Sequence, residues 1–359
     1  MTTGMKKFTK GCLLTALVIF IIGAVLCGVG GLLGGFRLLN SMDIREVTGL
    51  PFVFRFRPNG RFDGFSFWDE NDIDWGRYEN WERISVSSRL GDTIGDIDDI
   101  DGPAPALDLT GDTLRELYIE VAACELYIKE SEDDHVRLAI DGDTNRFRYR
   151  AEDGSLRIVG KSGWEMKWIG INVDMTDKMY LYLPKETELD YVDIEVGAGT
   201  MKSVGLMARD ANIEVGAGEV NLDSLTVDGD VVLLVGAGEI RIKNLVCDKA
   251  DMDIGAGELD IDDAAIREKA NIDLGMGNVN IGGVIAGDLN VNCGMGNVIL
   301  DMDDAEQDHN YEIDCSMGTV RVGRHSYTGL GSEQTIDNGS SSDFDIDCSM
   351  GNVTVKFAE

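Results

Sequence analysis

Three glutamates occupy the same place in successive repeats of this 359-residue chain. Glu219, Glu239 and Glu258 each follow a Gly-Ala-Gly triplet, and 20 and then 19 positions separate them. Carboxylates held together at such regular spacing repel one another unless a cation or a basic partner neutralises them. They are therefore weak candidates for a divalent-cation site. The alternative is a solvated acidic face that keeps the repeat soluble.

Residues that could support catalysis are few. His135, His309 and His325 are far apart in sequence and none is near a pair of cysteines, which leaves little for histidine catalysis or a histidine metal site. We predict no catalytic residues and no cofactor beyond a weakly held cation. A carbohydrate-active enzyme that uses pairs of Asp and Glu remains an alternative, because only the tertiary structure can show whether unlike acids share a cleft.

The net charge excludes one class of partner. The chain has 32 Lys and Arg against 65 Asp and Glu, a formal net charge of −33. Recognition of phosphate backbones needs a basic surface, so we predict that the protein binds no nucleic acid.

The triplets that precede the glutamates recur through the second half of the chain. Eight triplets of the form Gly-Ala-Gly, Gly-Met-Gly or Ser-Met-Gly begin at intervals of 19, 20, 19, 20, 19, 22 and 33 residues. A period this regular is typical of a solenoid, in which each repeat forms one coil. The glycines predicted to form the corners of the coils are Gly197, Gly199, Gly216, Gly218, Gly236, Gly238, Gly255, Gly257, Gly275, Gly277, Gly294, Gly296, Gly318 and Gly351.

The flanks of the triplets indicate which kind of solenoid is formed. Apolar and polar residues alternate before each triplet, as in Ile213-Glu214-Val215, and again after it, as in Val220-Asn221-Leu222, which is typical of half-buried β-strands. The apolar phase slips at the triplet, where glycine accepts backbone angles that other residues resist. We therefore predict an all-β fold with a parallel β-solenoid of 19–20 residues per coil over residues 193–359. Residues 114–192 are predicted to form an N-terminal β part that contains a first, atypical repeat.

The N-terminus has the composition of a membrane segment. Residues 11–36 carry no charge and follow three lysines, and at ~1.5 Å per residue they can cross a hydrocarbon core of ~30 Å. We predict a short cytoplasmic tail at 1–10, a single transmembrane helix at 11–36 in the lipid bilayer, and an aromatic and acidic stalk or linker at 37–113. A cleaved signal peptide is the alternative. Gly30 and Gly34 have the spacing that lets two membrane helices approach, which predicts a homodimer.

The strand Tyr180–Lys185, the segment Leu189–Gly199 and the later apolar-x-apolar-Gly/Ser-x-Gly-x-Val repeats resemble the DUF4097 family of bacterial adhesin-like, LiaG-like β-strand-repeat proteins. The resemblance covers roughly residues 114–356. It implies a β-solenoid exposed on a cell envelope, and it supplies no catalytic residues.

The membrane segment, the predicted solenoid and the family resemblance together lead to a functional expectation. We expect a single-pass membrane protein whose extracytoplasmic solenoid is not an enzyme and has an adhesin-like or envelope-interaction role with an unidentified envelope partner. The alternative is an accessory or sensor component of an envelope-stress response system, acting with a membrane-protein partner. Two candidate partner surfaces are the polar insertion at 324–342, which is as readily a cap for the final coil, and a loop with Trp164 and Trp168. Three cysteines, Cys293, Cys315 and Cys348, are predicted to be small core residues, with a disulfide as the alternative.

Overall fold

The computed structural model describes residues 113–131, 133, 135–142, 144–160, 177–328 and 331–358, together with the backbone of three short strands at 52–56, 62–67 and 82–83. No helix within these ranges is long and apolar enough to cross a bilayer. The predicted membrane segment at 11–36, with Gly30 and Gly34, lies outside the described residues, as do Trp164 and Trp168.

The chain divides into two compact units, one formed by Met1–Val47 with Pro51–Glu70 and the other by Thr48–Leu50 with Asn71–Glu359. In the first unit, the strands β1 (Phe52–Phe56) and β2 (Phe62–Phe67) pair as an antiparallel hairpin with an irregularity at its turn end. This hairpin falls within the segment predicted as a stalk.

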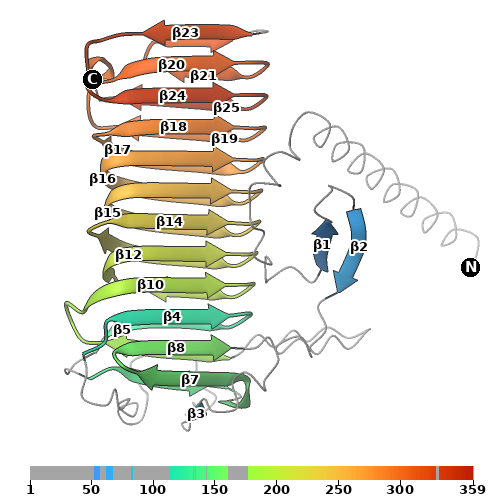
Figure 1. The fold of residues 1–359 in the computed structure, drawn as a ribbon, viewed down its shortest axis with the longest axis vertical. Helices are drawn as coiled ribbons and strands as arrows, with labels where there is room; N and C mark the ends of the chain where they lie inside the picture. The colour runs from blue at the N-terminus through green and yellow to red at the C-terminus, as the bar shows by residue number, and fades with distance from the viewer. Residues whose placement is uncertain are drawn as a thin grey trace, which may run out of the picture. The chain divides into compact units, whose positions relative to one another are not determined.

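The second unit is a stack of coils whose strands pair in parallel (Figure 1). Each strand lies beside the equivalent strand one repeat away, so that Ile194 faces Ile213 and Ile254 faces Leu274. The predicted all-β architecture of stacked parallel coils is therefore confirmed. The strands are β3 (Glu82–Arg83), β4 (Glu116–Val121), β5 (Glu125–Glu130), β6 (Arg137–Asp141), β7 (Phe147–Glu152), β8 (Ser155–Gly160), β9 (Lys178–Leu183), β10 (Glu188–Val196), β11 (Thr200–Ser203), β12 (Leu206–Val215), β13 (Glu219–Val227), β14 (Asp230–Val235), β15 (Glu239–Ile254), β16 (Glu258–Leu274), β17 (Asn278–Ile285), β18 (Asp288–Cys293), β19 (Asn297–Met302), β20 (Asn310–Cys315), β21 (Thr319–Val322), β22 (His325–Thr328), β23 (Ser332–Ile336), β24 (Asp343–Cys348) and β25 (Asn352–Phe357), with short 3-10 turns η3 (Thr144–Arg146) and η4 (Glu306–Asp308).

The core is built from the apolar residues that alternate with polar ones along each strand. Ile194, Ile213, Leu233, Met252 and Ile272 are buried and stand above one another in five successive coils. Each coil thus supplies the same apolar positions, and stacking removes them from water together. The polar residues between them point outward and form columns on the surface.

The triplets form the corners between two strands of a coil. The sequence predicted glycine there for its unusual backbone angles, but the structure gives a different reason. None of the fourteen corner glycines has a positive φ angle. Instead, a Cβ atom on Gly218 would collide with the carbonyl oxygen of Gly199, and one on Gly277 would collide with that of Gly257. Glycine is needed because neighbouring corners approach backbone to backbone, rather than for an unusual backbone conformation.

At the N-terminal end, the coils do not follow the order of the chain. The pair β4–β5 lies between β10–β11 and β8–β9, so the chain forms an inner coil first and the outermost coil second. The strands β6 and β7 then pair antiparallel with β9 and β8. These antiparallel strands cover the end of the parallel stack.

The C-terminal end repeats this arrangement in reverse. The final strands β24–β25 insert between β18–β19 and β20–β21, so the last coil in sequence is not the last coil in space. The segment predicted as a polar insertion forms β22 and β23, which pair antiparallel with β21 and β20. Cys348 consequently lies between Cys293 and Cys315, and all three are buried free thiols, as the core prediction required.

Candidate functional site

The strands that follow the corners present a grid of outward side chains, and the predicted glutamates belong to it. Glu219, Glu239 and Glu258 are in register on β13, β15 and β16. Because alternate residues of a strand share a face, two more columns run parallel to this glutamate ladder. The second column contains Asn221, Arg241 and Asp260, and the third contains Asp223, Lys243 and Asp262.

Arg241 lies among the carboxylates of the glutamate ladder. Its Nη1 donates to Oε1 of Glu219 at 2.9 Å, its Nη2 pairs with Glu239, and its Nε is 3.9 Å from Oδ2 of Asp260. Burial raises the pKa of the Glu239 carboxyl, Arg241 lowers it, and the neighbouring acids Glu258 and Glu219 raise it further. One guanidinium therefore offsets the repulsion within the ladder.

The Arg241 guanidinium would compete with a divalent cation for the same carboxylates. Carboxylate oxygens of Glu239, Glu258 and Asp260 lie within 4.8 Å of one another, a separation that one ion could bridge. The structure thus brings two of the predicted residues together and adds Asp260, while Glu219 turns toward Arg241. A divalent cation at this position stays a prediction.

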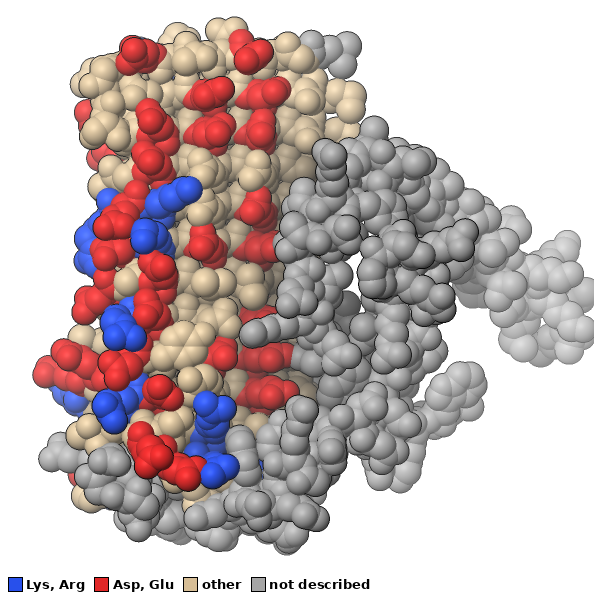
Figure 2. Space-filling model, in the orientation of Figure 1, with Lys and Arg blue, Asp and Glu red and all other residues tan. Residues whose placement is uncertain are grey.

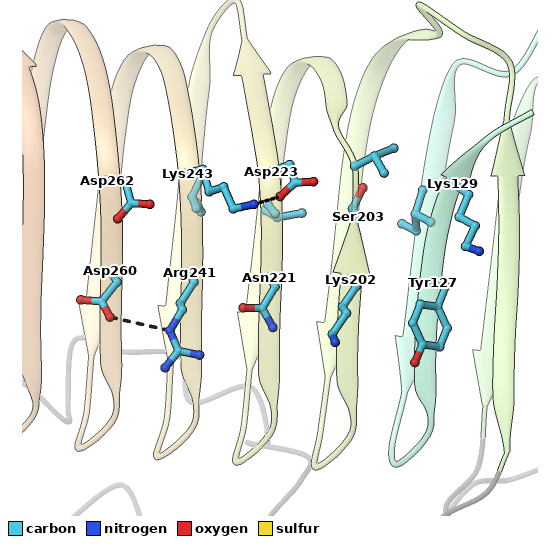
Figure 3. Close-up of a pocket in the computed structure, with 14 residues that line it drawn as sticks. Tyr127, Lys129, Lys202, Ser203, Asn221, Asp223, Arg241, Lys243, Asp260 and Asp262 are labelled. Atoms are coloured by element: carbon cyan, nitrogen blue, oxygen red, sulfur yellow. Dashed lines mark ion pairs between the residues drawn. The ribbon is translucent and has the colours of Figure 1, made fainter. Parts of the chain in front are cut away.

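Beside the ladder, the second and third columns form a groove of about 470 Å³ that crosses five coils (Figure 3). Within it, Lys243 pairs with Asp223 at 2.5 Å and Arg241 faces Asp260. The outward polar side chains of the groove are those of Tyr127, Lys129, Lys202, Asn221, Asp223, Arg241, Lys243, Asp260 and Asp262.

One end of the groove is aromatic and basic. Tyr127 stacks on Tyr180 with ring centroids 5.2 Å apart, and the Lys129 amine lies 5.7 Å from the centre of the Tyr180 ring. Burial and the hydrogen bond to Glu125 raise the pKa of Tyr127 to about 12, so its hydroxyl stays protonated and donates at 2.9 Å. Lys202, which is exposed, makes no ion pair with any described residue. This end therefore offers two ammonium groups to a ligand.

Tyr127, Lys129 and Lys202 were not predicted as site residues. The local signal was the alternation Glu125-Leu126-Tyr127-Ile128-Lys129, which places Tyr127 and Lys129 on one outward face. The pairing of Lys202 with Tyr127 depends on the register between β11 and β5, which are about 75 residues apart in sequence. The predicted surface at 324–342 includes β22 and β23, which pair antiparallel with β21 and β20 as the capping alternative expects, and its role in binding stays a prediction.

The family model described as Toastrack DUF4097 matches residues 114–357. No curated protein matches the chain. Solved structures similar to it include a proposed adhesin from Bacteroides fragilis NCTC 9343 (13% identity, 68% of this chain and 93% of that chain, TM-score 0.42). A second is a proposed lipid-binding protein from Parabacteroides distasonis ATCC 8503 (16% identity, 68% of this chain and 92% of that chain, TM-score 0.38). A third is a proposed cell adhesion protein from Clostridium sporogenes ATCC 15579 (11% identity, 71% of this chain and 97% of that chain, TM-score 0.22).

Proposed function

We propose, from the premise that this chain belongs to the Toastrack DUF4097 family, that it is a non-enzymatic, adhesin-like protein whose solenoid binds a component of the cell envelope. The observation that carries the proposal is the groove, which crosses several coils and holds both fixed ion pairs and two ammonium groups at one end. A surface of this kind suits an extended, polar ligand, because successive coils repeat donors and acceptors at ~4.8 Å.

The proposal assigns binding rather than catalysis to this surface. Acid–base catalysis on a carbohydrate needs one protonated and one ionised carboxyl on either side of the bond to be cleaved. In the groove, Asp223 pairs with Lys243, and Asp260 lies 3.9 Å from Arg241. Carboxylates that already have a cationic partner suit the recognition of a polar ligand.

The location forms part of the same proposal. The uncharged run at 11–36 would anchor the chain in a membrane, with the solenoid on the extracytoplasmic side. Intact-mass measurement of the protein from its producing cell tests this, because an anchored chain keeps residues 11–36 whereas a signal peptide is removed.

Binding is tested with the full chain and isolated envelope material. Substituting Lys129→Glu and Lys202→Glu together should reduce co-sedimentation with this material several-fold, because both ammonium groups of the groove become carboxylates. The matched control is Lys185→Glu, which reverses an exposed charge on the turn between β9 and β10. Equal binding by the wild type, the double variant and the Lys185→Glu control would overturn the assignment to the groove.

Chemical crosslinking of the full chain in its cell distinguishes the two roles. Crosslinks to a membrane protein would favour the accessory or sensor role.

A further inference from the structure

Four methionines form an exposed column at the corners of the last four coils of the stack. Met276, Met295, Met350 and Met317 are the middle residues of their triplets, with exposed fractions of 61%, 50%, 47% and 60%. Methionine is usually buried in soluble domains. Its exposure at one position in four neighbouring coils therefore indicates a role outside the core.

Backbone hydrogen bonds hold these four residues in register. The amide of Met295 donates to the carbonyl of Gly275, that of Met350 to Gly294 and that of Met317 to Ser349, each at 2.8 Å. Neighbouring Cα atoms in such a stack are ~4.8 Å apart, and the methionine side chain has three rotatable bonds. Two or three adjacent thioether sulfurs can thus converge on one point.

The corners do not need methionine in order to form. The same position is alanine in the four preceding coils, at Ala198, Ala217, Ala237 and Ala256, and there too the amides bond to the neighbouring corner, for example from Ala256 to Gly236 at 2.8 Å. A methyl group therefore satisfies the fold, and the thioether is an addition to it.

The surroundings of the column are polar and anionic. The outward column just before these corners consists of Asp273, Asn292, Asp347 and Asp314, in register. Burial raises the pKa of Asp347, and so do the neighbouring acids, Asp314 first among them. Figure 2 shows Asp and Glu over the upper coils of the face drawn there, with Lys and Arg gathered lower down. The residues just after the corners are neutral: Asn278, Asn297, Asn352 and Thr319.

We propose that the methionine column binds a soft monovalent cation, Cu(I) or its analogue Ag(I), through thioether sulfur. Thioethers are soft, neutral ligands that select Cu(I) over hard cations, which prefer oxygen. The acidic column beside them supplies the attraction for a positive charge. The polar residues on both sides confine the apolar surface to a single line, which is too narrow for an apolar docking patch. This site is separate from the groove and does not rest on the proposed function.

The test is a titration of the full chain, in detergent, with Ag(I), followed by calorimetry and by the methyl resonances of 13C-labelled methionine. Ag(I) should shift the resonances of the four column residues. Met350→Leu, which removes a central sulfur at nearly constant volume, should weaken Ag(I) binding at least tenfold. Met207→Leu is the matched control, because Met207 is 39% exposed on β12, outside the column. All cysteines are kept, so thiol binding is the same in every protein.

Three results would overturn the proposal. The first is equal Ag(I) affinity for the Met350→Leu and Met207→Leu variants. The second is unchanged resonances of the four column methyl groups at saturating Ag(I). If the variant with all four residues changed to Leu keeps its fold by thermal melting and also keeps the wild-type affinity, the column is an apolar edge and not a metal site.

Discussion

Arg241 is the residue on which the acidic ladder depends. It contacts carboxylates of three neighbouring coils, Glu219, Glu239 and Asp260, and it also borders the groove. It therefore links the stability of the stack with the charge of the candidate binding surface.

Replacing Arg241 by Ala should expose the repulsion that it now offsets. Because the side chain is about half exposed, we expect a loss of ~1 kcal/mol in unfolding free energy. Millimolar CaCl2 should restore part of this loss in the variant and have little effect on the wild type, since the ion then replaces the guanidinium. Urea unfolding with and without CaCl2 measures both. Arg209→Ala, which removes an exposed pair with Asp210, is the control. Equal stabilisation of wild type and R241A by calcium would show that Arg241 does not compete with the ion.

Glu195 makes the stability of the stack depend on pH. Burial, and then the charges of Glu214, Glu120 and Asp193, raise its pKa from the model-compound value of 4.5 to about 8. Between these values the unfolded chain is ionised there while the folded chain keeps the proton, so the folded state binds more protons. The contribution of Glu195 to stability is therefore full below pH 4.5 and is lost as the pH rises toward 8.

Glu195→Gln should remove this dependence. We expect the urea midpoint of the variant to exceed that of the wild type at pH 9 and the difference to shrink at pH 5, because glutamine stays neutral throughout. Glu188→Gln, at the exposed start of the same strand, is the control. A difference between E195Q and wild type that is constant over this range would contradict the assignment.

At the scale of elements, the corners decide how closely coils stack. A Cβ on Gly238 would collide with the carbonyl oxygen of Gly218 and lie 2.7 Å from a methyl carbon of Val215. Ala237, its neighbour in the same triplet, is exposed. Two adjacent positions of one corner thus differ completely in the space they offer.

Gly238→Val should destabilise the protein by ~3 kcal/mol or more, because the coils on both sides must separate to admit the side chain. Ala237→Val adds a β-branched side chain one residue away and should cost less than ~0.5 kcal/mol. Chemical denaturation of the two variants gives the comparison. Similar losses of unfolding free energy in the two variants would show that neighbouring coils can separate at the corner and that glycine is not needed for their close approach.

The inserted coil β24–β25 is fixed by a buried polar cluster at its start. Ser342 Oγ donates to the carbonyl of Gly287 at 2.6 Å, so Nδ1 of His309, 2.8 Å away, must donate to that oxygen. Nε2 of His309 bonds to Asp304 at 2.9 Å, and its ring stacks on Phe344 with centroids 4.0 Å apart. These contacts tie β24 to both of its neighbours.

At the scale of the whole molecule, like charges in columns oppose the compact state. The net charge is −33, and acidic columns run along the stack (Figure 2). Repulsion between such columns falls when salt screens them.

Raising NaCl from about 0.01 M to about 1 M shortens the screening length from ~30 Å to ~3 Å. We expect the melting temperature to rise by ~5 °C, since repulsion outweighs the exposed ion pairs. KCl should act equally, because screening does not depend on the identity of the ion. A fall in melting temperature with salt would mean that attractive pairs such as Lys243–Asp223 dominate instead.

The structure of a single coil could be predicted from local sequence patterns. The interval between triplets sets the length of a repeat, and the period-two alternation on both sides of Gly216-Ala217-Gly218 sets which side chains enter the core. These are local properties, repeated often enough to be unambiguous. The sequence also located the glutamate ladder, since equal positions in equal coils must stack.

The order of the coils and the lining of the groove could not be predicted in this way, because both depend on contacts between segments far apart in the sequence. The strands β20 and β24 both end in Ile-Asp-Cys and are both followed by Ser-Met-Gly, so either could lie beside β18 in the same register. The local sequence pattern therefore does not distinguish the two strands. In the order that is adopted, Ser342 contacts both His309 and Gly287. Lys202 lies beside Tyr127 for a related reason. The chain leaves β5 and forms the coil β8–β9 on one side of β4–β5, and it then forms β10–β11 on the other side.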